Sequence, residues 1–153
     1  MQTDATTFTF DSDRMWDWAV GMAQHVAKLS KDPSTQVGAV IFDNKRRLVS
    51  AGYNGLPRGV HDNETRLADR ETKYKMILHA ERNAMAFATA PLEGATLFCT
   101  HPCCTQCASQ IIQMGIAHVC WPTPDPAFVE RWSNDMTLSM EMFIEAGVTV
   151  HVR

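Results

Sequence analysis

The sequence predicts an α/β fold, because segments with strand character alternate with segments of helical periodicity in the second half of the chain. The alternation begins at residue 79 and gives three helices, each followed by a strand. Earlier in the chain, two β-rich stretches joined by the polar turn DNKR are typical of an antiparallel hairpin. We therefore expect a five-stranded mixed sheet that opens with this hairpin and lies between helices in three α/β/α layers.

One helix is expected before the hairpin. Apolar residues recur at helical spacing from Met15 to Leu29, and the DSD of residues 11–13 offers a capping side chain. A residue that precedes proline disfavours the helical region, so this helix must end before Asp32 and Pro33. The sequence therefore predicts a first helix between these two signals.

The hairpin strands are expected at residues 36–43 and 47–53. The loop NGLPRG (54–59) follows, and its glycines and proline indicate irregular structure. Residues 60–78 are polar and charged, which indicates either a surface excursion or a short helix. This region therefore separates the hairpin from the alternating half of the chain.

From residue 79 onwards the helices act as crossovers between strands. Gly115 and Gly147 stand where helix C-terminal glycines belong, so they mark the ends of two helices. Strands that are joined by helices share one sheet through crossover connections. We expect helices at 79–90, 105–114 and 126–146, and strands at 95–100, 116–121 and 148–152.

The composition is that of an ordinary globular protein, with 45% apolar and 20% charged residues. A length of 153 residues predicts a single domain, residues 1–153, with its own core. The net charge of −3 argues against a dedicated nucleic-acid partner but allows an anionic small molecule. No apolar run reaches the length of a membrane span, and the first ten residues lack a leader pattern, so we expect a cytoplasmic protein without a membrane partner.

Three cysteines stand within five positions of the stretch THPCCTQCA, at 103, 104 and 107. In a cytoplasmic protein, clustered cysteines indicate metal binding or redox chemistry rather than disulfides. Cys104 and Cys107 form a CxxC at the expected start of a helix, where a spacing of three brings both sulfurs to one face and the helix dipole favours thiolates. Cys103 and Cys107 are the competing pair, but Pro102 and the strand exit come directly before Cys103 and favour the first pair.

Two cysteines do not complete a zinc site, and His79 at the start of the preceding helix is the best third ligand. Three protein ligands leave a fourth position for water, as in catalytic zinc sites, where the pKa of water falls to roughly 7. Glu81 serves the same site only if His79 lies at the very start of its helix, because a spacing of two otherwise separates the side chains. Glu81 would then be a proton shuttle rather than a ligand. A redox pair is the alternative interpretation of the CxxC.

The order of these motifs is more specific than any one of them. An H-x-E that opens a helix, followed after about 25 residues by P-C-C-x-x-C, is typical of zinc nucleobase deaminases. Beyond the zinc motifs, the chain resembles deoxycytidylate (dCMP) deaminases of the zinc-dependent cytidine/deoxycytidylate deaminase superfamily along nearly its whole length. The resemblance rests on SKDPSTQVGAVIFD (30–43), SAGYNGLPRG (50–59), HAERNA (79–84), THPCCTQCASQIIQMGI (100–116) and AGVTV (146–150).

The resemblance implies a cytidine deaminase-like fold and a hydrolase that converts dCMP to dUMP and ammonia in the synthesis of dTTP precursors. It implies one catalytic Zn²⁺ per chain, held by His79, Cys104 and Cys107, with Glu81 as the catalytic residue that protonates N3 of the base and then the departing amine. Family members are usually homo-oligomers, often hexamers. Many are activated by dCTP with Mg²⁺ and inhibited by dTTP.

The resemblance and the need for phosphate donors also suggest contacts with nucleotides. The substrate-binding candidates are Asn54, Val37, Thr35, Ala80, Pro102, Cys103 and Arg131. The effector is expected near the GYNG loop, and the allosteric and phosphate candidates are Ser30, Lys31, Asn54, Gly55, Arg58 and Gly59.

The zinc motif departs from the family pattern at Pro102 and Cys103. Relatives carry an aromatic residue and then proline before the first ligand cysteine, whereas proline and cysteine occupy these places here. A base that normally meets an aromatic ring would meet Pro102, which predicts weaker stacking or a changed preference for modified cytosine. Residues 60–78 contain His61 but no cysteine, so we expect no second zinc.

Other functions stay open at this point. A bifunctional dCMP/dCTP deaminase, a modified-cytosine nucleotide deaminase and a tRNA or free-base deaminase would use the same motifs, although an RNA editor needs a basic face. The non-enzyme alternative is a zinc-stabilised nucleotide-sensing module. Glu81 argues against it, because a structural zinc site needs no proton shuttle and closes with a fourth ligand. Cys99 and Cys120 fall in apolar strands and are expected in the core.

Overall fold

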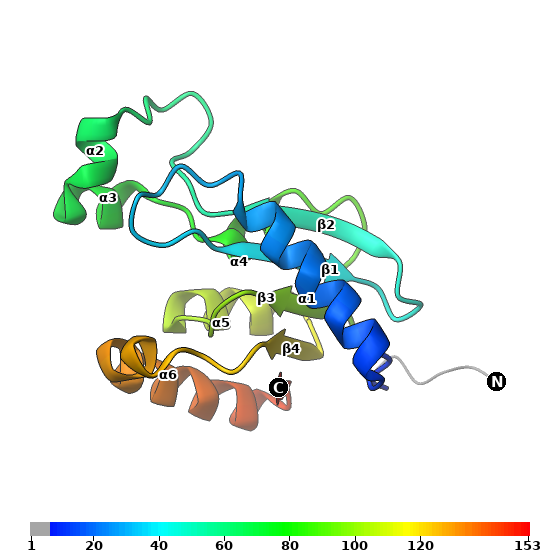
Figure 1. Ribbon diagram of the computed structural model, residues 1–153. Helices are drawn as coiled ribbons and strands as arrows, with labels where there is room; N and C mark the ends of the chain where they lie inside the picture. The colour runs from blue at the N-terminus through cyan, green and yellow to red at the C-terminus, as the bar shows by residue number, and fades with distance from the viewer. Residues whose placement is uncertain (1–6) are drawn as a thin grey trace.

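The computed structural model describes residues 7–153; residues 1–6, part of the stretch that lacks a leader pattern, lie outside the described residues. Five strands form one sheet, and helices lie on both sides of it (Figure 1). The strands are β1 (Gly38–Phe42), β2 (Leu48–Tyr53), β3 (Thr96–Cys99), β4 (His118–Trp121) and β5 (Thr149–Val152). The helices are α1 (Asp13–Ala27), α2 (Glu64–Ala68), α3 (Arg70–Met76), α4 (Ala80–Ala86), α5 (Thr105–Gln113) and α6 (Pro126–Ala146).

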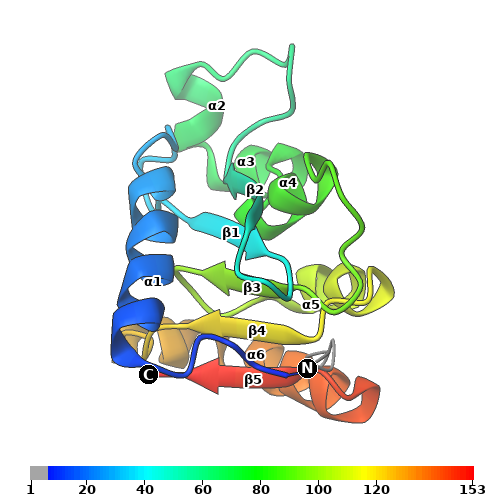
Figure 2. The same cartoon turned by 90° about the vertical axis from the view of Figure 1, so that its right-hand side faces the viewer.

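The strand order is β2-β1-β3-β4-β5, as Figure 2 shows. Strand β1 pairs antiparallel with β2 and with β3, whereas β3, β4 and β5 run parallel. The expected mixed sheet with an opening hairpin is therefore confirmed. Within the described residues, no helix is both long and apolar enough to cross a bilayer.

Strand β1 shows how the three layers are built. Side chains on a strand alternate between the two faces. Val40 and Phe42 pack in the core under α1, and Ala39 and Ile41 pack in the core under α4, α5 and α6. All four are fully buried, so β1 lies between the two helical layers (Figures 1 and 2).

Local signals set several helix boundaries. The hydroxyl of Ser12 accepts a hydrogen bond from a backbone amide in the first turn of α1 and caps that helix. Gly147 ends α6 with a left-handed φ of 78°, as its position predicts. His79 is the N-cap of α4, which meets the geometric condition that the sequence sets for a site shared with Glu81. Helix α4 stops before Phe87, earlier than its helical pattern suggests.

Residues 60–78 form two short helices rather than one. Asn63 caps α2 and Asp69 caps α3, each through a side chain that accepts from a backbone amide. A β-bridge between Gly55 and Leu78 ties the end of this excursion to the loop after β2. Helix α3 also buries Lys73, so the excursion contributes to the interior of the molecule.

Candidate active site

The three predicted metal ligands come together at the amino ends of two helices. His79 precedes α4, Cys104 is the N-cap of α5, and Cys107 lies one turn further along. The Nδ1 atom of His79 lies 3.3 Å from the Sγ atom of each cysteine, and the ligand atoms of all three residues lie within 4.8 Å of one another. Nitrogen and sulfur ligands on a tetrahedral zinc ion would be about 3.6 Å apart. The donor types and their spacing therefore fit zinc.

The helix start favours the thiolate form of Cys104. Its sulfur accepts a hydrogen bond from the backbone amide of Cys107 at 3.4 Å. Hydrogen bonds with the Cys107 side chain and with His79 outweigh burial and lower the pKa of Cys104 to about 4. The hydrogen bond to Cys104 raises the pKa of His79 in turn. A thiolate is the form in which cysteine binds a metal.

Cys103 lies behind the wall of the site. Its side chain is 2% exposed, packs in the core cluster beside α5, and does not line the cavity described below. Burial raises the pKa of its thiol well above the usual value. Pro102 and Cys104, its neighbours in the extended segment, do line the cavity, so the alternation of side chains turns Cys103 away. This corrects the expectation that Cys103 contacts the substrate.

Glu81 lies in the first turn of α4 and is 4% exposed. It lines the same cavity as His79 and Cys104. The thiol of Cys99 donates a hydrogen bond to its Oε1 atom at 2.8 Å. Burial and the nearby carboxylate raise the pKa of Cys99 well above its usual value, so the thiol keeps the proton that it donates. The expected burial of Cys99 is confirmed, and its contact with Glu81 is an additional finding.

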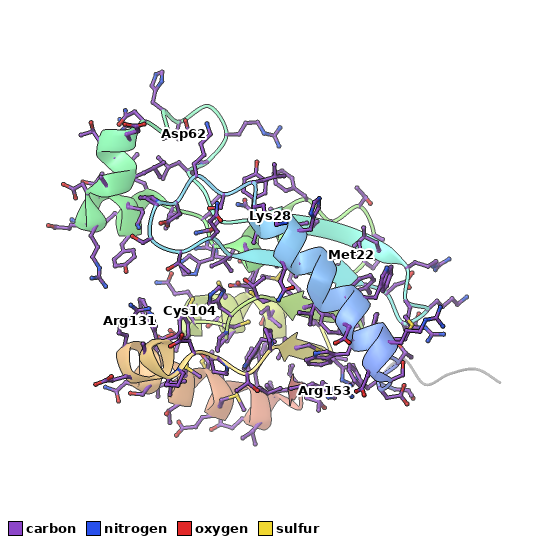
Figure 3. All side chains as sticks on the ribbon, viewed as in Figure 1. Met22, Lys28, Asp62, Cys104, Arg131 and Arg153 are labelled. Carbon is purple, nitrogen blue, oxygen red and sulfur yellow. The ribbon has the colours of Figure 1, made fainter. Side chains whose placement is uncertain are left out.

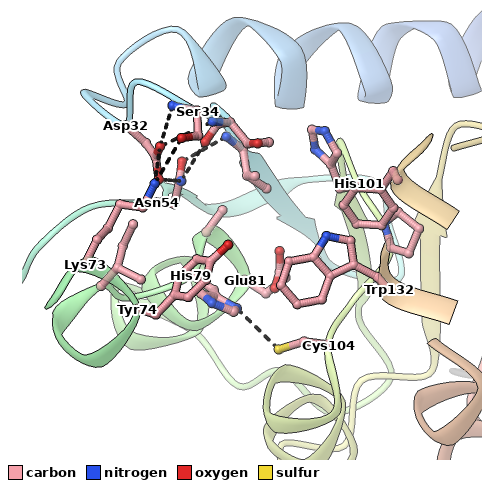
Figure 4. A pocket seen from close by; sticks show the side chains of 16 residues that line it. Asp32, Ser34, Asn54, Lys73, Tyr74, His79, Glu81, His101, Cys104 and Trp132 are labelled. Atoms are coloured by element: carbon pink, nitrogen blue, oxygen red, sulfur yellow. Dashed lines mark hydrogen bonds and ion pairs between the residues drawn. The ribbon is translucent and has the colours of Figure 1, made fainter. Parts of the chain in front are cut away.

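A cavity of about 150 Å³ opens above these residues (Figure 4). Its walls come from the loop after α1, from α3, from the starts of α4 and α6, and from the segment after β3. Tyr74 and Trp132 meet edge to face with ring centroids 6.4 Å apart, and Phe128 lies 6.2 Å from Trp132. Aromatic surfaces therefore reach the cavity from α3 and α6, and Pro102 also lines it.

Apart from Cys103, the predicted substrate contacts line two hollows. The residues of that set that line the first cavity are Val37, Thr35, Asn54, Ala80 and Pro102. Arg131, on α6 (Figure 3), lines a neighbouring hollow of about 410 Å³ instead. The two hollows share Thr35, His101 and Phe128, so they adjoin.

Asn54 shapes the wall of the cavity through hydrogen bonds within the protein. Its Oδ1 atom accepts from the amide of Val37 at 2.8 Å. Its Nδ2 atom donates to the carbonyl of Thr35 at 2.9 Å and to Oδ2 of Asp32 at 3.4 Å. The side chain therefore fixes residues 32–37 against the loop after β2.

The remaining phosphate and effector candidates lie away from the cavity. Ser30 is buried, and its hydroxyl donates to the carbonyl of Asn54. Lys31 pairs with Asp62 at 2.9 Å on the surface, and Arg58 lies over an aromatic ring next to the end of α4. The candidates that do not line the cavity are Ser30, Lys31, Gly55, Arg58 and Gly59.

The sequence does not predict four charged or polar residues of the cavity wall: Asp32, Ser34, Lys73 and His101. Asp32 and Ser34 lie in the SKDPSTQVG segment, but no pattern there marks them as site residues. Lys73 and Lys75 look alike in a charged stretch, and only the orientation of α3 separates the buried one from the exposed one. Burial lowers the pKa of His101, so its ring is largely neutral at pH 7.

Comparisons with known proteins agree with this geometry. The model of the cytidine and deoxycytidylate deaminase zinc-binding region matches residues 14–123, which include His79, Cys104 and Cys107. The chain is 48% identical over 129 residues to an uncharacterised deaminase in the luxG 3′ region of Aliivibrio fischeri, and the match covers 84% of this chain and 86% of that protein.

Two further relatives are named for their activity. The deoxycytidylate deaminase of Homo sapiens is 36% identical over 129 residues, which cover 80% of this chain and 70% of that protein. The crystal structure of dCMP deaminase from the cyanophage S-TIM5 in apo form matches with a TM-score of 0.71 at 25% identity, and the match covers 93% of this chain and 99% of that chain.

Proposed function

This chain belongs to the cytidine and deoxycytidylate deaminase family and is an enzyme of that family, and we propose that it hydrolyses dCMP to dUMP and ammonia. The proposal rests chiefly on the position of Glu81, whose buried carboxylate lines the same cavity as His79 and Cys104, two of the three clustered metal-ligand candidates. The activity in the names of the human and cyanophage relatives supports dCMP as the substrate.

The metal would be held by His79, Cys104 and Cys107, whose nitrogen and sulfur atoms lie at distances that suit one ion. When bound, zinc supplies a Lewis acid that lowers the pKa of a water molecule towards neutrality. The three ligands are fixed at two helix starts, so they are arranged before any substrate enters.

Glu81 is proposed to carry two protons in turn. It accepts the first proton from the attacking water and delivers it to N3 of the cytosine ring. It then takes the second proton of that water and delivers it to the C4 amine, which leaves as ammonia. The water oxygen becomes the C4 carbonyl oxygen of dUMP, and one water proton stays on N3, so the atoms balance. Burial of Glu81 keeps this exchange away from bulk solvent.

The cavity also suits a planar pyrimidine. Small side chains at Val37 and Ala80 leave room beside Glu81, and the rings of Tyr74, Phe128 and Trp132 offer apolar faces. Aromatic surface of this kind binds a flat base well. We therefore propose that Phe128 and Trp132 on α6 contribute the apolar contacts that Pro102 cannot provide.

A further part of the proposal concerns regulation and assembly. We propose activation by dCTP with Mg²⁺ and inhibition by dTTP, in a cytoplasmic homo-oligomer for which a hexamer is favoured. The resemblance of the GYNG loop to that of regulated relatives supports this part. The exposed side chain of Arg58 in this loop offers a cation for an effector phosphate.

The substrate assignment is tested by incubating the zinc-loaded protein with dCMP, dCTP, deoxycytidine, CMP or adenosine and measuring ammonia release. Each substrate is assayed alone, with dCTP and Mg²⁺, and with dTTP. We expect the highest kcat/KM for dCMP, an increase with dCTP and a decrease with dTTP. A lack of dCMP turnover under every condition would refute the proposed reaction, and identical rates with and without effectors would refute the regulation.

A further inference from the structure

Lys73 is a buried lysine in the wall of the candidate active site. Its side chain is 4% exposed and reaches the cavity from α3 (Figure 4). The Nζ atom lies 3.0 Å from Oδ1 of Asp32, whose side chain is 6% exposed. Removing an ammonium group from water is costly, and a buried ion pair often adds no net stability to the fold. The position of Lys73 is therefore better explained by a role in the cavity than by stability.

Asp32 and Lys73 differ in the hydrogen-bonding capacity that they have left. Oδ1 of Asp32 accepts from the amides of Ser34 at 2.8 Å and Thr35 at 3.2 Å as well as from Lys73, and Oδ2 accepts from Asn54. An ammonium group has three N–H donors. Lys73 directs one to Asp32 and one to the Ser34 hydroxyl at 3.4 Å, which leaves the third for a ligand in the cavity.

The surroundings of Lys73 suit an anion. The hydroxyl-bearing residues Ser34 and Thr35 line the cavity beside it. The Asp32 carboxylate already accepts hydrogen bonds from several donors. It therefore repels an incoming anion less than a carboxylate without such partners would. An ammonium group with neighbouring hydroxyls is a common arrangement for binding phosphate oxygens. Among the described residues that line this cavity, Lys73 is the one lysine or arginine.

We infer that Lys73 binds the 5′-phosphate of the nucleotide, with Ser34 and Thr35 as hydroxyl donors and with Asp32 holding the lysine in place. The inference rests on the proposed function and specifies it, because it names the group by which the cavity distinguishes a nucleoside monophosphate from a nucleoside. It keeps Thr35 from the residues suggested by the sequence and adds Lys73, whereas Lys31 is exposed and Arg131 lines the neighbouring hollow.

The test compares kcat/KM for dCMP and for deoxycytidine in the zinc-loaded protein and in the Lys73→Met variant. Loss of one hydrogen bond to a charged group is expected to lower kcat/KM for dCMP roughly 10- to 100-fold. The value for deoxycytidine, which lacks the phosphate, is expected to stay within about threefold.

A second variant separates phosphate binding from folding. Lys73→Met alone leaves Asp32 buried without its counter-ion, which is destabilising. The double variant Asp32→Asn/Lys73→Met removes both charges and keeps an Oδ1 acceptor for the amides of residues 34 and 35. It should show the same selective loss for dCMP. Lys75→Met, at an exposed position two residues along α3, is the matched control and should keep the preference for dCMP.

Binding of dUMP and of deoxyuridine, measured by calorimetry, gives a readout that does not depend on turnover. The unaltered protein should bind dUMP more tightly, and both Lys73 variants should bind the two compounds alike. The assignment is overturned if folded Lys73 variants keep the preference, if they lose both substrates equally, or if Arg131→Met alone abolishes the preference. A lack of dCMP turnover by the unaltered protein would refute the proposed function instead, and the dUMP comparison would still decide the role of Lys73.

Discussion

The thiol of Cys99, at the end of β3, donates a hydrogen bond to Oε1 of Glu81, in the first turn of α4, at 2.8 Å. Both side chains are almost completely buried. A buried carboxylate that accepts such a bond has fewer rotamers available than a free one. The contact therefore links the sheet to the carboxylate that is proposed to move protons.

Replacement of Cys99 should impair catalysis without removing the metal. Cys99→Val deletes the donor and adds about one methyl group, so we expect kcat for dCMP to fall about 3- to 10-fold while zinc content stays unchanged. Cys99→Ser should restore most of the rate, because a hydroxyl donates to the same oxygen. Cys120→Val is the control at a buried cysteine in the other core cluster. If Cys99→Val and Cys120→Val have equal rates, Cys99 has no positioning role.

Zinc content tests which cysteines hold the metal. Cys104→Ala and Cys107→Ala each remove one of the clustered ligand atoms, so both variants should lose most of their zinc. Cys103→Ala, which changes a core residue outside the cluster, should retain about one zinc per chain. Metal analysis after purification measures all three. Loss of zinc from Cys103→Ala together with retention in Cys104→Ala would show that the pairing is wrong by one residue.

At Gly52 the hairpin closely approaches α4, the helix that carries Glu81. A Cβ atom at this position would clash with the amide nitrogen of Ala84 and lie 2.7 Å from the carbonyl oxygen of Ala80, both in α4. Gly52→Ala should therefore destabilise the fold by about 1 to 3 kcal/mol and lower dCMP turnover, as measured by urea unfolding and by rate. Gly21→Ala, on an exposed face of α1 with nothing within 4 Å, should leave stability equal or higher. Equal stability of the two variants would argue against this close approach.

A pair of histidines near one edge of the sheet is expected to make the stability of the fold depend on pH. The ring of His151 on β5 stacks on Phe8 at 3.7 Å, and its Nε2 atom lies 3.1 Å from Nδ1 of His118 on β4. Burial, together with His118 and Arg153, lowers the pKa of His151 from 6.5 to about 4. The unfolded chain takes up a proton near pH 6.5, whereas the folded chain does so only near pH 4. The stability that depends on neutral His151 is therefore fully present above pH 6.5. It declines as the pH falls towards 4, because protonation favours the unfolded chain.

Urea unfolding at pH 7.5 and pH 5 measures this effect. The free energy of unfolding of the unaltered protein should fall over this interval, and His151→Phe should reduce the fall by about 1 kcal/mol, a value discounted for the partial exposure of the ring. His25→Gln changes an exposed histidine of α1 and should keep the full dependence. The same pH dependence in both variants would exclude His151 as its source.

The sequence predicts most of the fold because local signals determine it. Helix α6 spans the residues expected for it, since Pro126 begins the helix and Gly147 ends it in the left-handed conformation. The proximity of Cys104 and Cys107 is predictable for a similar reason, because helix geometry relates their spacing in sequence to their spacing in space. The end of α4 was not predictable from propensity, because the helical pattern continues beyond Phe87.

The rest of the site depends on packing between distant segments. Lys73 and Lys75 stand two residues apart in one short helix, so they face different directions, and only the packing of α3 decides which one is buried. Cys103 lies beside the predicted metal ligand Cys104 in sequence yet belongs to the core, because the extended segment turns it away from the cavity. No pattern within the sequence predicts the burial of Lys73 or the orientation of Cys103.

The rate of dUMP formation from dCMP by the zinc-loaded protein, measured beside Glu81→Gln at equal zinc content, decides whether Glu81 moves the protons of the reaction. We expect steady turnover by the unaltered protein and a rate lower by about 10²- to 10⁴-fold in the variant, because Glu81 is proposed to carry both protons. Comparable rates in the two proteins, or no turnover by the unaltered protein, would contradict this proposal.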